Sequence, residues 1–292
     1  MYDRPNQDPS RPCMVTCALS GVVANRAQCA AIPYTPEEYA AEAKRAYEAG
    51  AAAVHIHARS PDGAPSFEVE DYRNIRDAIM AACPVILNFS TGAVGVSVEK
   101  RLDYVRTLTP AVAALNMGSM NYAKYNPRKK AFVFDFVFAN PHAEIITFLT
   151  AMNAAGVKPE MECFDSGHIG SIYPLIDMGL LTPPFQVSLI LGVVGGIPAS
   201  TKNLLHQVES LPPDSDWEVI GLSLDQWRLC AAAASIGGNV RVGLEDNFYL
   251  SPGVMARSNG DLVEKVVRMV RDQGREIASV AACRERLGLQ HP

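Results

Sequence analysis

Two histidines, His55 and His57, stand near the end of the apolar segment AAVHIHAR (52–59). Residues two apart on a strand point to one face, so both imidazoles can reach a single ion while Ile56 points away. Neutral imidazole is a common ligand of zinc and related divalent metals. The alternative is a pair of polar core histidines that are hydrogen-bonded to their neighbours. The pairing at a strand end, followed by the loop ARSPDGAP, favours the metal.

Glu245 is the third candidate ligand, in the segment RVGLEDN. Arg241, Gly243 and Glu245 share one parity of a predicted strand over 239–245, so all three can point to the same interior. Two histidines and one carboxylate with an open position form a known catalytic zinc set. The structural alternative is an ion pair between Glu245 and Arg241. Asp246 follows directly, either as a general base whose basicity Arg241 and the cation set, or as an Asx turn.

Polar side chains also end the predicted third and fourth strands, in the segments NFSTGA and LNMGSMN. Amide and hydroxyl groups there can bind the carboxylate or carbonyl oxygen of a substrate, and a glycine allows close backbone approach. Because no base lies within NFSTGA, a serine hydrolase is only weakly indicated. The substrate-binding candidates are Asn88, Ser90, Thr91, Gly92, Asn116 and Ser119.

Gly195 and Gly196 follow the predicted sixth strand and precede a helix that starts near Ser200. Backbone N–H groups at such a junction can cradle a phosphate or an amide of pantetheine, so both glycines are candidate contacts for a CoA-type cosubstrate. The segment is not a G-x-G-x-x-G motif after the first strand. A dinucleotide-binding fold is therefore not supported.

Eight strand–helix units position these residues. The strands are apolar throughout rather than alternating, which is typical of a parallel sheet covered by helices. Eight such units in a row favour a single-domain (β/α)8 TIM barrel, whose active sites lie at the C-terminal ends of the strands. The first helix shows the expected signals, with Thr35 as N-cap, Pro36 in first position and Gly50 at the end. The predicted strands cover 14–20, 52–59, 84–90, 111–119, 158–165, 185–194, 217–224 and 239–245.

Most of the 292 residues fit this barrel, assigned to 13–292, with a polar N-terminal arm over 1–12. A small excursion is expected near 120–140, where the aromatic run AFVFDFVF (131–138) predicts an extra hairpin and hints at a contact within a homo-oligomer. The predicted fifth helix covers 168–180. No linker or low-complexity tract divides the chain, so one domain is predicted.

Composition narrows the class of partner. With 26 basic and 31 acidic residues the net charge is −5, which provides no broad basic field for nucleic acid or an anionic membrane. The seven cysteines contain no C-x-x-C pair and indicate reduced thiols. No apolar signal region or membrane-length segment occurs. A cytoplasmic enzyme acting on small molecules is expected.

Taken together, six motifs resemble the β-keto acid cleavage enzyme family. They are TPEEYAAEAKRAYEAGAAAVHIHAR, NFSTG, LNMGSMN, GVKPEMECFDSGH, LGVVGG and NVRVGLEDNFYLSPGVMARSNGDLVEKV, in the family's order from about residue 15 to residue 289. The resemblance implies a zinc-dependent barrel that exchanges a β-keto acid with acetyl-CoA. The products would be acetoacetate and the CoA ester of the remaining acid.

The resemblance also implies roles for particular residues. A bound metal would polarise the substrate ketone, and a carboxylate beside an arginine would remove a proton next to a carbonyl. The implied roles are zinc ligation by His55, His57 and Glu245, binding of the substrate carboxylate with help from Ser90, and proton abstraction and retro-Claisen cleavage involving Asp246 with Arg241.

One stretch departs from the family's aminohexanoate enzyme. There, an acidic residue near the end of strand one is associated with recognising the ammonium group of the substrate. Val23 takes that position here, and no carboxylate occurs between Leu19 and Glu37. The hypothesis is a neutral or apolar β-keto acid.

Three other functions stay open on the residues alone. A metal-dependent hydrolase of the amidohydrolase type also uses H-x-H, but on strand one and with a further histidine on strand six, and neither is present here. A metal-dependent aldolase or lyase would act without CoA, and would release a free aldehyde or acid. A catalytically inactive binding barrel is the non-enzymatic alternative, which metal analysis would test.

Overall fold

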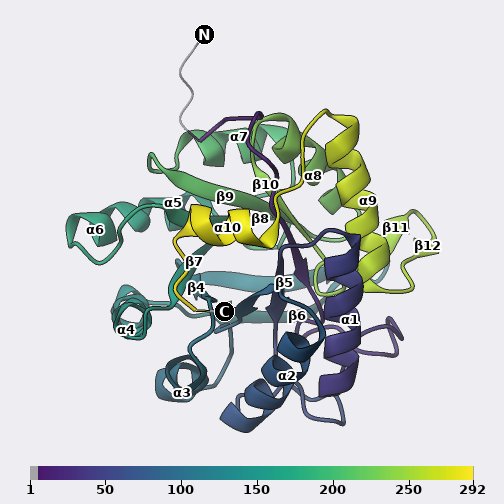
Figure 1. Cartoon of the computed structure of the whole chain (residues 1–292), viewed down its shortest axis with the longest axis horizontal. Helices are drawn as coiled ribbons and strands as arrows, with labels where there is room; N and C mark the ends of the chain where they lie inside the picture. Colours follow the sequence, from purple (N-terminus) through teal and green to yellow (C-terminus); the bar gives the residue numbers. More distant parts are fainter. Residues whose placement is uncertain (1–5, 292) are drawn as a thin grey trace.

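Eight parallel strands close into a barrel with helices around it (Figure 1), as the sequence predicts. The computed structural model describes residues 6–291. The barrel strands follow one another in the circular order β1-β10-β9-β8-β7-β4-β3-β2, so the second and eighth of them both flank the first. Their bounds are β1 Val15–Ala18, β2 Ala53–Ile56, β3 Ile86–Phe89, β4 Val112–Asn116, β7 Lys158–Cys163, β8 Phe185–Leu191, β9 Ser215–Gly221 and β10 Asn239–Val242.

The helices alternate with these strands and cover the outside of the barrel. In α1 the predicted signals act as expected: Thr35 and Glu38 form a reciprocal capping box, and Gly50 ends the helix with a φ of 115°. The helices are α1 Pro36–Ala49, α2 Val69–Ala82, α3 Val98–Leu108, α4 His142–Ala154, α5 Ser166–Gly170, α6 Ile172–Asp177, α7 Thr201–Glu209, α8 Asp225–Ser235, α9 Asn259–Asp272 and α10 Val280–Leu287. In the part of the chain from 6 to 291, no helix combines the length and apolar character needed to cross a bilayer.

The helix predicted over 168–180 is wrong in its extent. The structure divides this segment into two short helices, α5 and α6. Pro174 has no N–H and its ring crowds the carbonyl four residues earlier, at Gly170, where α5 ends. The break therefore has a local cause.

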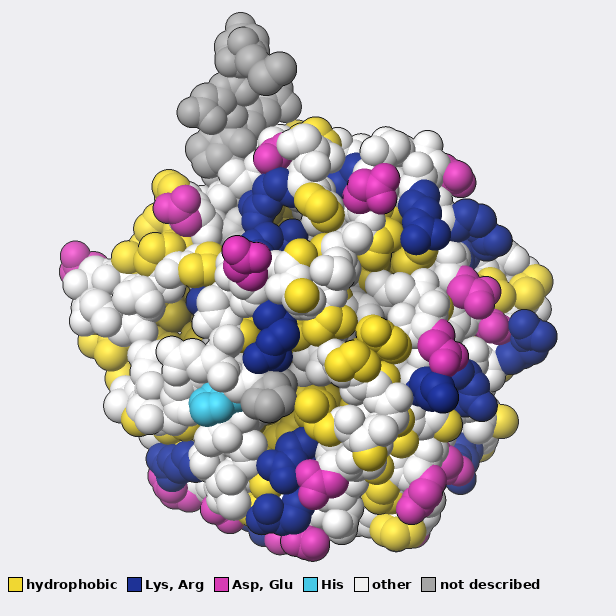
Figure 2. Space-filling model, viewed as in Figure 1, with side chains coloured by type: hydrophobic (Ala, Val, Ile, Leu, Met, Phe, Trp, Pro, Cys, Tyr) yellow, Lys and Arg dark blue, Asp and Glu magenta, His cyan; other side chains and the backbone are white. Residues whose placement is uncertain are grey.

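Two elements were not predicted. Helix α10 lies across one end of the barrel (Figure 1), where Cys283 and Leu287 pack against Met14, Ile86 and Val112 at the strand starts. The face that carries α10 mixes acidic, basic and apolar side chains (Figure 2). A short hairpin, β11 (Tyr249–Ser251) with β12 (Val254–Met255), follows β10.

The first hairpin of the chain leaves the barrel after β4. Its strands are β5 (Met120–Asn126) and β6 (Ala131–Phe138), and they pair antiparallel with Tyr122 opposite Phe136. An isolated bridge between Ala123 and Val194 ties the hairpin to the loop after β8. The aromatic run of the sequence is therefore a strand that stands beside the mouth of the barrel.

Candidate active site

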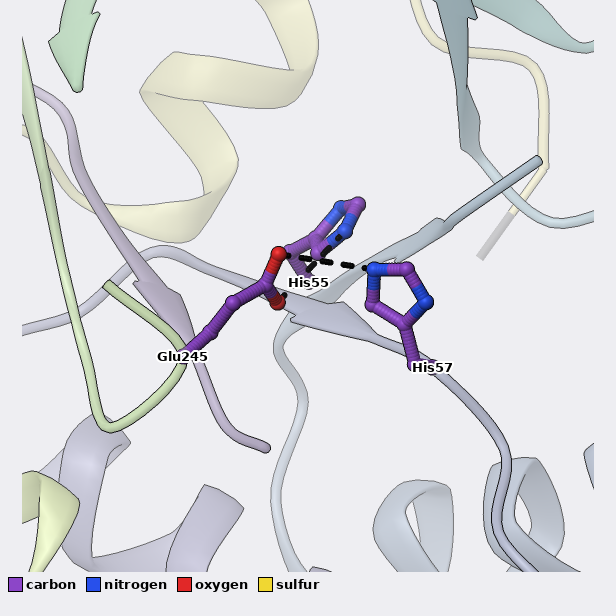
Figure 3. Close-up of side chains that lie close together, drawn as sticks. All are labelled: His55, His57 and Glu245. Atoms are coloured by element: carbon purple, nitrogen blue, oxygen red, sulfur yellow. Dashed lines mark ion pairs between the residues drawn. The ribbon is translucent and has the colours of Figure 1, made fainter. Parts of the chain in front are cut away.

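Two buried histidines and the partly buried Glu245 converge at the C-terminal end of the barrel. His55 Nε2 lies 3.8 Å from Glu245 Oε2, and His57 Nε2 lies 3.4 Å from Glu245 Oε1. One candidate ligand atom from each residue lies within 4.8 Å of the other two. Figure 3 shows the two imidazoles and the carboxylate pointing toward one another. The side chains thus meet as a metal site requires.

The donor set fits a divalent cation. Among residues 6–291, His55 Nδ1 and Glu245 Oε2 have no hydrogen-bond partner, and unpaired buried polar atoms are costly unless something satisfies them. Burial and the charge of Arg241 hold the pKa of His55 well below its usual range, so its ring nitrogens are available for bonding. Burial opposes ionisation of Glu245, but Arg241 and the two histidines hold the pKa of its carboxyl well below the usual range.

Glu245 reaches this place by a route that differs from the predicted one. Strand β10 ends at Val242, and Gly243 has a φ of 138°, so the parity argument over 239–245 is wrong. A Cβ at Gly243 would lie 2.1 Å from the carbonyl oxygen of Ala18, so only glycine fits this turn. Gly21 is likewise close, since a Cβ there would meet Glu245 Cγ at 2.7 Å. Two glycines therefore let the loop carry Glu245 to the histidines.

Arg241 joins the triad to a neighbouring carboxylate. Its Nε and Nη2 donate to the two oxygens of Asp246 at 3.0 and 3.1 Å, and Nη2 also donates to Glu245 at 2.9 Å. The ion pair that was the structural alternative for Glu245 thus coexists with the convergence on the histidines. Burial raises the pKa of Asp246 to about 6, although Arg241 opposes the shift. Its side chain faces Arg241 rather than closing an Asx turn on its own backbone.

An open cavity of about 890 Å³ lies over these residues. Its size is within the range of pockets that hold small molecules. The polar residues of its wall include His57, Ser90, Asn116, Glu162, Arg241, Glu245 and Asp246. A separate cavity of about 710 Å³ between α1 and α9 contains none of the predicted site residues.

The sequence profile of the beta-keto acid cleavage enzymes matches residues 12–289. The chain belongs to this family. It is 39% identical over 278 residues to the 3-keto-5-aminohexanoate cleavage enzyme of Acetoanaerobium sticklandii, covering 94% of this chain and 98% of that one. It is 33% identical to the 3,5-dioxohexanoate:acetyl-CoA acetone transferase of Paraburkholderia graminis, covering 96% of each.

A solved structure supports the fold of this β-keto acid cleavage enzyme family member. The apo structure of ObcA superposes with a TM-score of 0.75 at 20% sequence identity. The alignment covers 88% of this chain and 65% of ObcA, so this chain spans slightly less than two thirds of that protein's length. At this identity the likeness concerns the barrel alone.

The predicted substrate-binding residues divide into two groups. Ser90, Gly92 and Asn116 line the cavity, and Asn116 Oδ1 has no partner within the described chain. Ser90 Oγ accepts from the N–H of Gly92 at 3.2 Å, while the carbonyl of Ser90 accepts from the phenol of Tyr104 at 2.7 Å. The hydroxyl of Ser90 is therefore held in place at the wall by its own loop and by α3.

The other three candidates have partners away from the cavity. Asn88 donates to Glu160 in the barrel interior. Thr91 Oγ1 donates to the carbonyl of Ala114 at 2.6 Å, and Ser119 Oγ accepts from the N–H of Asn140 at 2.8 Å. These side chains hold neighbouring segments of backbone.

The glycine pair after β8 packs against the first hairpin. A Cβ at Gly195 would lie 1.8 Å from the carbonyl oxygen of Asn121, and one at Gly196 would lie 2.6 Å from that of Phe164. The cavity wall in this loop comes instead from Gly192, Val193 and Val194. Close packing therefore accounts for both glycines.

Two features of the cavity were not found from the sequence. Glu162, on β7, lies 3.6 Å from Arg241 Nη1, and burial together with the charge of Glu160 raises the pKa of Glu162 to about 8. The alternation E-x-E in KPEMEC is the same signal as H-x-H and could have revealed it. The second feature is the aromatic wall from β5 and β6, where Tyr122 and Phe136 line the cavity.

Proposed function

We propose that this protein converts a β-keto acid and acetyl-CoA into acetoacetate and the CoA ester of the remaining acid, with the help of a zinc-like divalent cation. The observation that carries the proposal is the convergence of His55, His57 and Glu245 beside the Arg241–Asp246 pair, in a chain of this family. The name of the relative from Paraburkholderia, an acetyl-CoA acetone transferase, supports the same type of reaction.

The metal site contributes charge to the reaction. His55, His57 and Glu245 would hold a divalent cation, which would supply a Lewis acid to polarise a substrate carbonyl. Burial of His55, with the charge of Arg241, keeps that imidazole uncharged and able to bind. Arg241 in turn fixes the direction of Glu245.

Asp246 is the proposed general base. It takes a proton from C2 of the β-keto acid, the carbon between the ketone and the carboxylate. A carboxyl with a pKa of about 6 is largely ionised at neutral pH, yet basic enough to hold the proton briefly. The two hydrogen bonds from Arg241 hold this carboxylate in one orientation.

The exchange of groups conserves atoms and electrons. C2 forms a bond to the acetyl carbonyl carbon, and the bond from that carbon to the CoA sulfur breaks. The CoA thiolate then bonds to C3, and the bond between C2 and C3 breaks. The proton on Asp246 returns to C2 of acetoacetate. No oxidant or further reactant is consumed.

Orientation of the substrate is assigned to Ser90 and Asn116, which both line the cavity. Ser90 would contact the substrate carboxylate through its hydroxyl, and Asn116 Oδ1 has no partner among residues 6–291. Groups that are held rigidly by their surroundings lower the entropic cost of bringing reactants together. For the tail of the substrate we propose an acid without an amino group, because Val23 lines the cavity where an acidic residue would be needed.

The test is an assay of the metal-loaded protein with acetyl-CoA and a panel of β-keto acids, in which new thioesters are detected by mass spectrometry. We expect one acyl-CoA and acetoacetate in equal amounts, loss of both after chelation, and recovery with zinc. Formation of a free acid or aldehyde without CoA would instead indicate a lyase. No product from any acid, with metal bound, would refute the proposal.

We also propose a homo-oligomer in a reducing, cytoplasmic setting. Val133 and Val137 are 59% and 64% exposed on the first hairpin, which supports a contact between copies of the chain. All seven cysteines are free and buried, which supports a reducing compartment. Light scattering of the purified chain tests the first point, and a monomer would refute it.

A further inference from the structure

The first hairpin places a stack of aromatic rings in the cavity wall. Tyr122 on β5 stacks on Phe136 of β6, with ring centroids 5.4 Å apart and planes 11° apart. Phe134 stacks on the same two rings, at 14° to Tyr122 and 25° to Phe136. All three rings line the cavity. Strands β5 and β6 form a sheet separate from the barrel, so closure of the barrel does not depend on these rings. The rings are therefore available to contact a ligand.

The stack borders the reactive end of the cavity. Tyr122 stands perpendicular to Phe138 and Phe164, and Phe164 follows directly after strand β7, which carries Glu162. Burial and the negative charges of Glu245 and Asp246 raise the pKa of Tyr122 to about 12, which agrees with this closeness. The triad and the rings therefore share one cavity, to which His57, Glu245 and Tyr122 all contribute.

Ring faces can hold an ammonium group, so the charges around the rings decide between a cationic and an uncharged substituent. The three rings lie nearly parallel, with ring centroids 5.4 to 6.0 Å apart, and form an apolar surface. A hydrocarbon chain, or a ring that packs edge-to-face, makes favourable contacts with such a surface.

The carboxylates of the cavity are already engaged. Glu245 faces the two histidines, and Asp246 is held by Arg241. Glu162 is the third, and it also lies against Arg241. None of them is free to balance the charge of an ammonium group on a substrate tail, and the nearby lip of the cavity carries the uncharged Val23.

We propose that the inner face of the β5–β6 hairpin, formed by Tyr122, Phe134 and Phe136, is the subsite for an uncharged alkyl or aryl substituent on C3 of the β-keto acid. This inference rests on the proposed function and narrows its substrate class. The substituent packs against the rings while the carboxylate of the same molecule lies near Ser90. An ammonium group in this place loses its hydration and gains no partner.

The first experiment compares substrates on the metal-loaded full-length protein. It measures kcat/KM with acetyl-CoA for 3-oxooctanoate and 3-oxo-3-phenylpropanoate, and for 3-oxo-5-aminohexanoate and 4-trimethylammonio-3-oxobutanoate. We expect the two uncharged acids to exceed the two cationic acids by roughly 10- to 100-fold, as hydrophobic pockets discriminate. A cationic acid that is turned over as well as the uncharged ones would overturn the subsite.

The second experiment changes one ring and keeps a matched control. Phe136→Ala should lower kcat/KM for 3-oxooctanoate about tenfold or more, while the value for 3-oxopentanoate changes less than about threefold. Phe132→Ala, on the same strand but 56% exposed and outside the cavity wall, should change neither. Equal loss for the long and the short acid would show a structural role and refute the proposal.

Two precautions keep the outcome decisive. If Phe136→Ala does not fold, two measurements replace the assay of that variant. One is the same assay on Phe136→Leu, and the other is calorimetric titration of the wild type with each acid in the absence of acetyl-CoA. Tight binding of the uncharged acids with a negative heat-capacity change is then expected. Absence of any new thioester from wild type would refute the proposed function, whereas thioester formation without preference for uncharged acids would refute the subsite alone.

Discussion

Two buried polar clusters lie in the same barrel, and only one of them has the features of a site. The mouth cluster contains His55, His57, Arg241, Glu245 and Asp246, and it opens into the cavity. The interior cluster lies deeper between the strands and contains Thr16, Asn88, Glu160, Ser188 and Glu218. Both contain two carboxylates, but the interior residues are all buried, whereas Glu245 in the mouth cluster is 18% exposed.

The clusters differ in how their carboxylate oxygens are satisfied. In the interior cluster Glu218 accepts from Thr16 at 2.7 Å, and Glu160 accepts from Asn88. Ser188 Oγ lies within hydrogen-bonding distance of both carboxyl groups. In the mouth cluster Glu245 Oε2 has no partner among residues 6–291. Burial of acidic groups therefore does not identify a site by itself. Unpaired donor atoms that face a cavity are the better criterion.

The largest expected effect comes from removing one histidine of the mouth cluster. His57→Ala should lose the bound metal and lower the rate of thioester formation by on the order of 10³-fold, because the substrate carbonyl loses its electrophile. His206→Ala, at an exposed position on α7, is the matched control. Metal analysis and the thioester assay check both variants. Full metal content with full activity in His57→Ala would contradict the assignment of the site.

The second prediction separates the base from the metal ligands. Asp246→Asn keeps the shape of the side chain and one of the two hydrogen bonds from Arg241, but has no carboxylate to accept a proton. We expect kcat to fall by about 10²- to 10⁴-fold, while metal content stays near that of the wild type. Asp272→Asn, on the exposed end of α9, should change neither quantity. Activity retained in Asp246→Asn would assign the proton transfer to another group.

The same two clusters show how far the sequence could predict the site. The structure brings His55 and His57 to one place beside Glu245, because His55 lies in β2 and His57 follows directly after that strand. Glu245 was placed in the right cluster for the wrong reason, since the turn at Gly243 ends the strand before it. Local periodicity cannot anticipate a turn that depends on contact with another strand, here at Ala18.

Loop residues were harder to interpret than strand residues. Ser90 and Thr91 are adjacent and chemically alike, yet Ser90 lines the cavity and Thr91 bonds to the backbone of Ala114. Nothing in the residue types distinguishes them, because the direction of a side chain after a strand end depends on loop conformation. Glu162 was missed, although the strand that carries it was predicted. The barrel was predicted correctly because eight buried strands alternate with helices along the chain.

A third prediction concerns the interior cluster and concerns stability rather than activity. Burial and the charge of Glu160 raise the pKa of Glu218 well above its ordinary value, so the folded chain keeps a proton that the unfolded chain releases above about pH 4.3. Stability then falls as the pH rises from that value toward the raised pKa. Glu218→Gln resembles the protonated acid and does not titrate.

The free energy of unfolding of the wild type should therefore fall relative to that of Glu218→Gln, by up to about 1.4 kcal/mol per pH unit. Urea unfolding at about pH 5, 6 and 7 measures this difference. Glu209→Gln, at the C-terminal end of α7, provides the comparison at a position outside the cluster. If the difference in the free energy of unfolding between the wild type and Glu218→Gln does not change with pH, Glu218 does not hold a proton in the folded chain.

The smallest expected effect comes from removing a hydrogen bond between helix α1 and the mouth cluster. The phenol of Tyr39, on α1, donates to the carbonyl of His57 at 2.6 Å and also bonds to Ser20. Tyr39→Phe should cost about 1 kcal/mol of stability, the usual value of one hydrogen bond, and should weaken metal binding only a few-fold. Tyr47→Phe, half-exposed on the same helix, is the control. Loss of stability with unchanged metal affinity would show that β2 alone holds the backbone of His57. The mouth cluster would then depend less on the outer helices than its hydrogen bonds indicate.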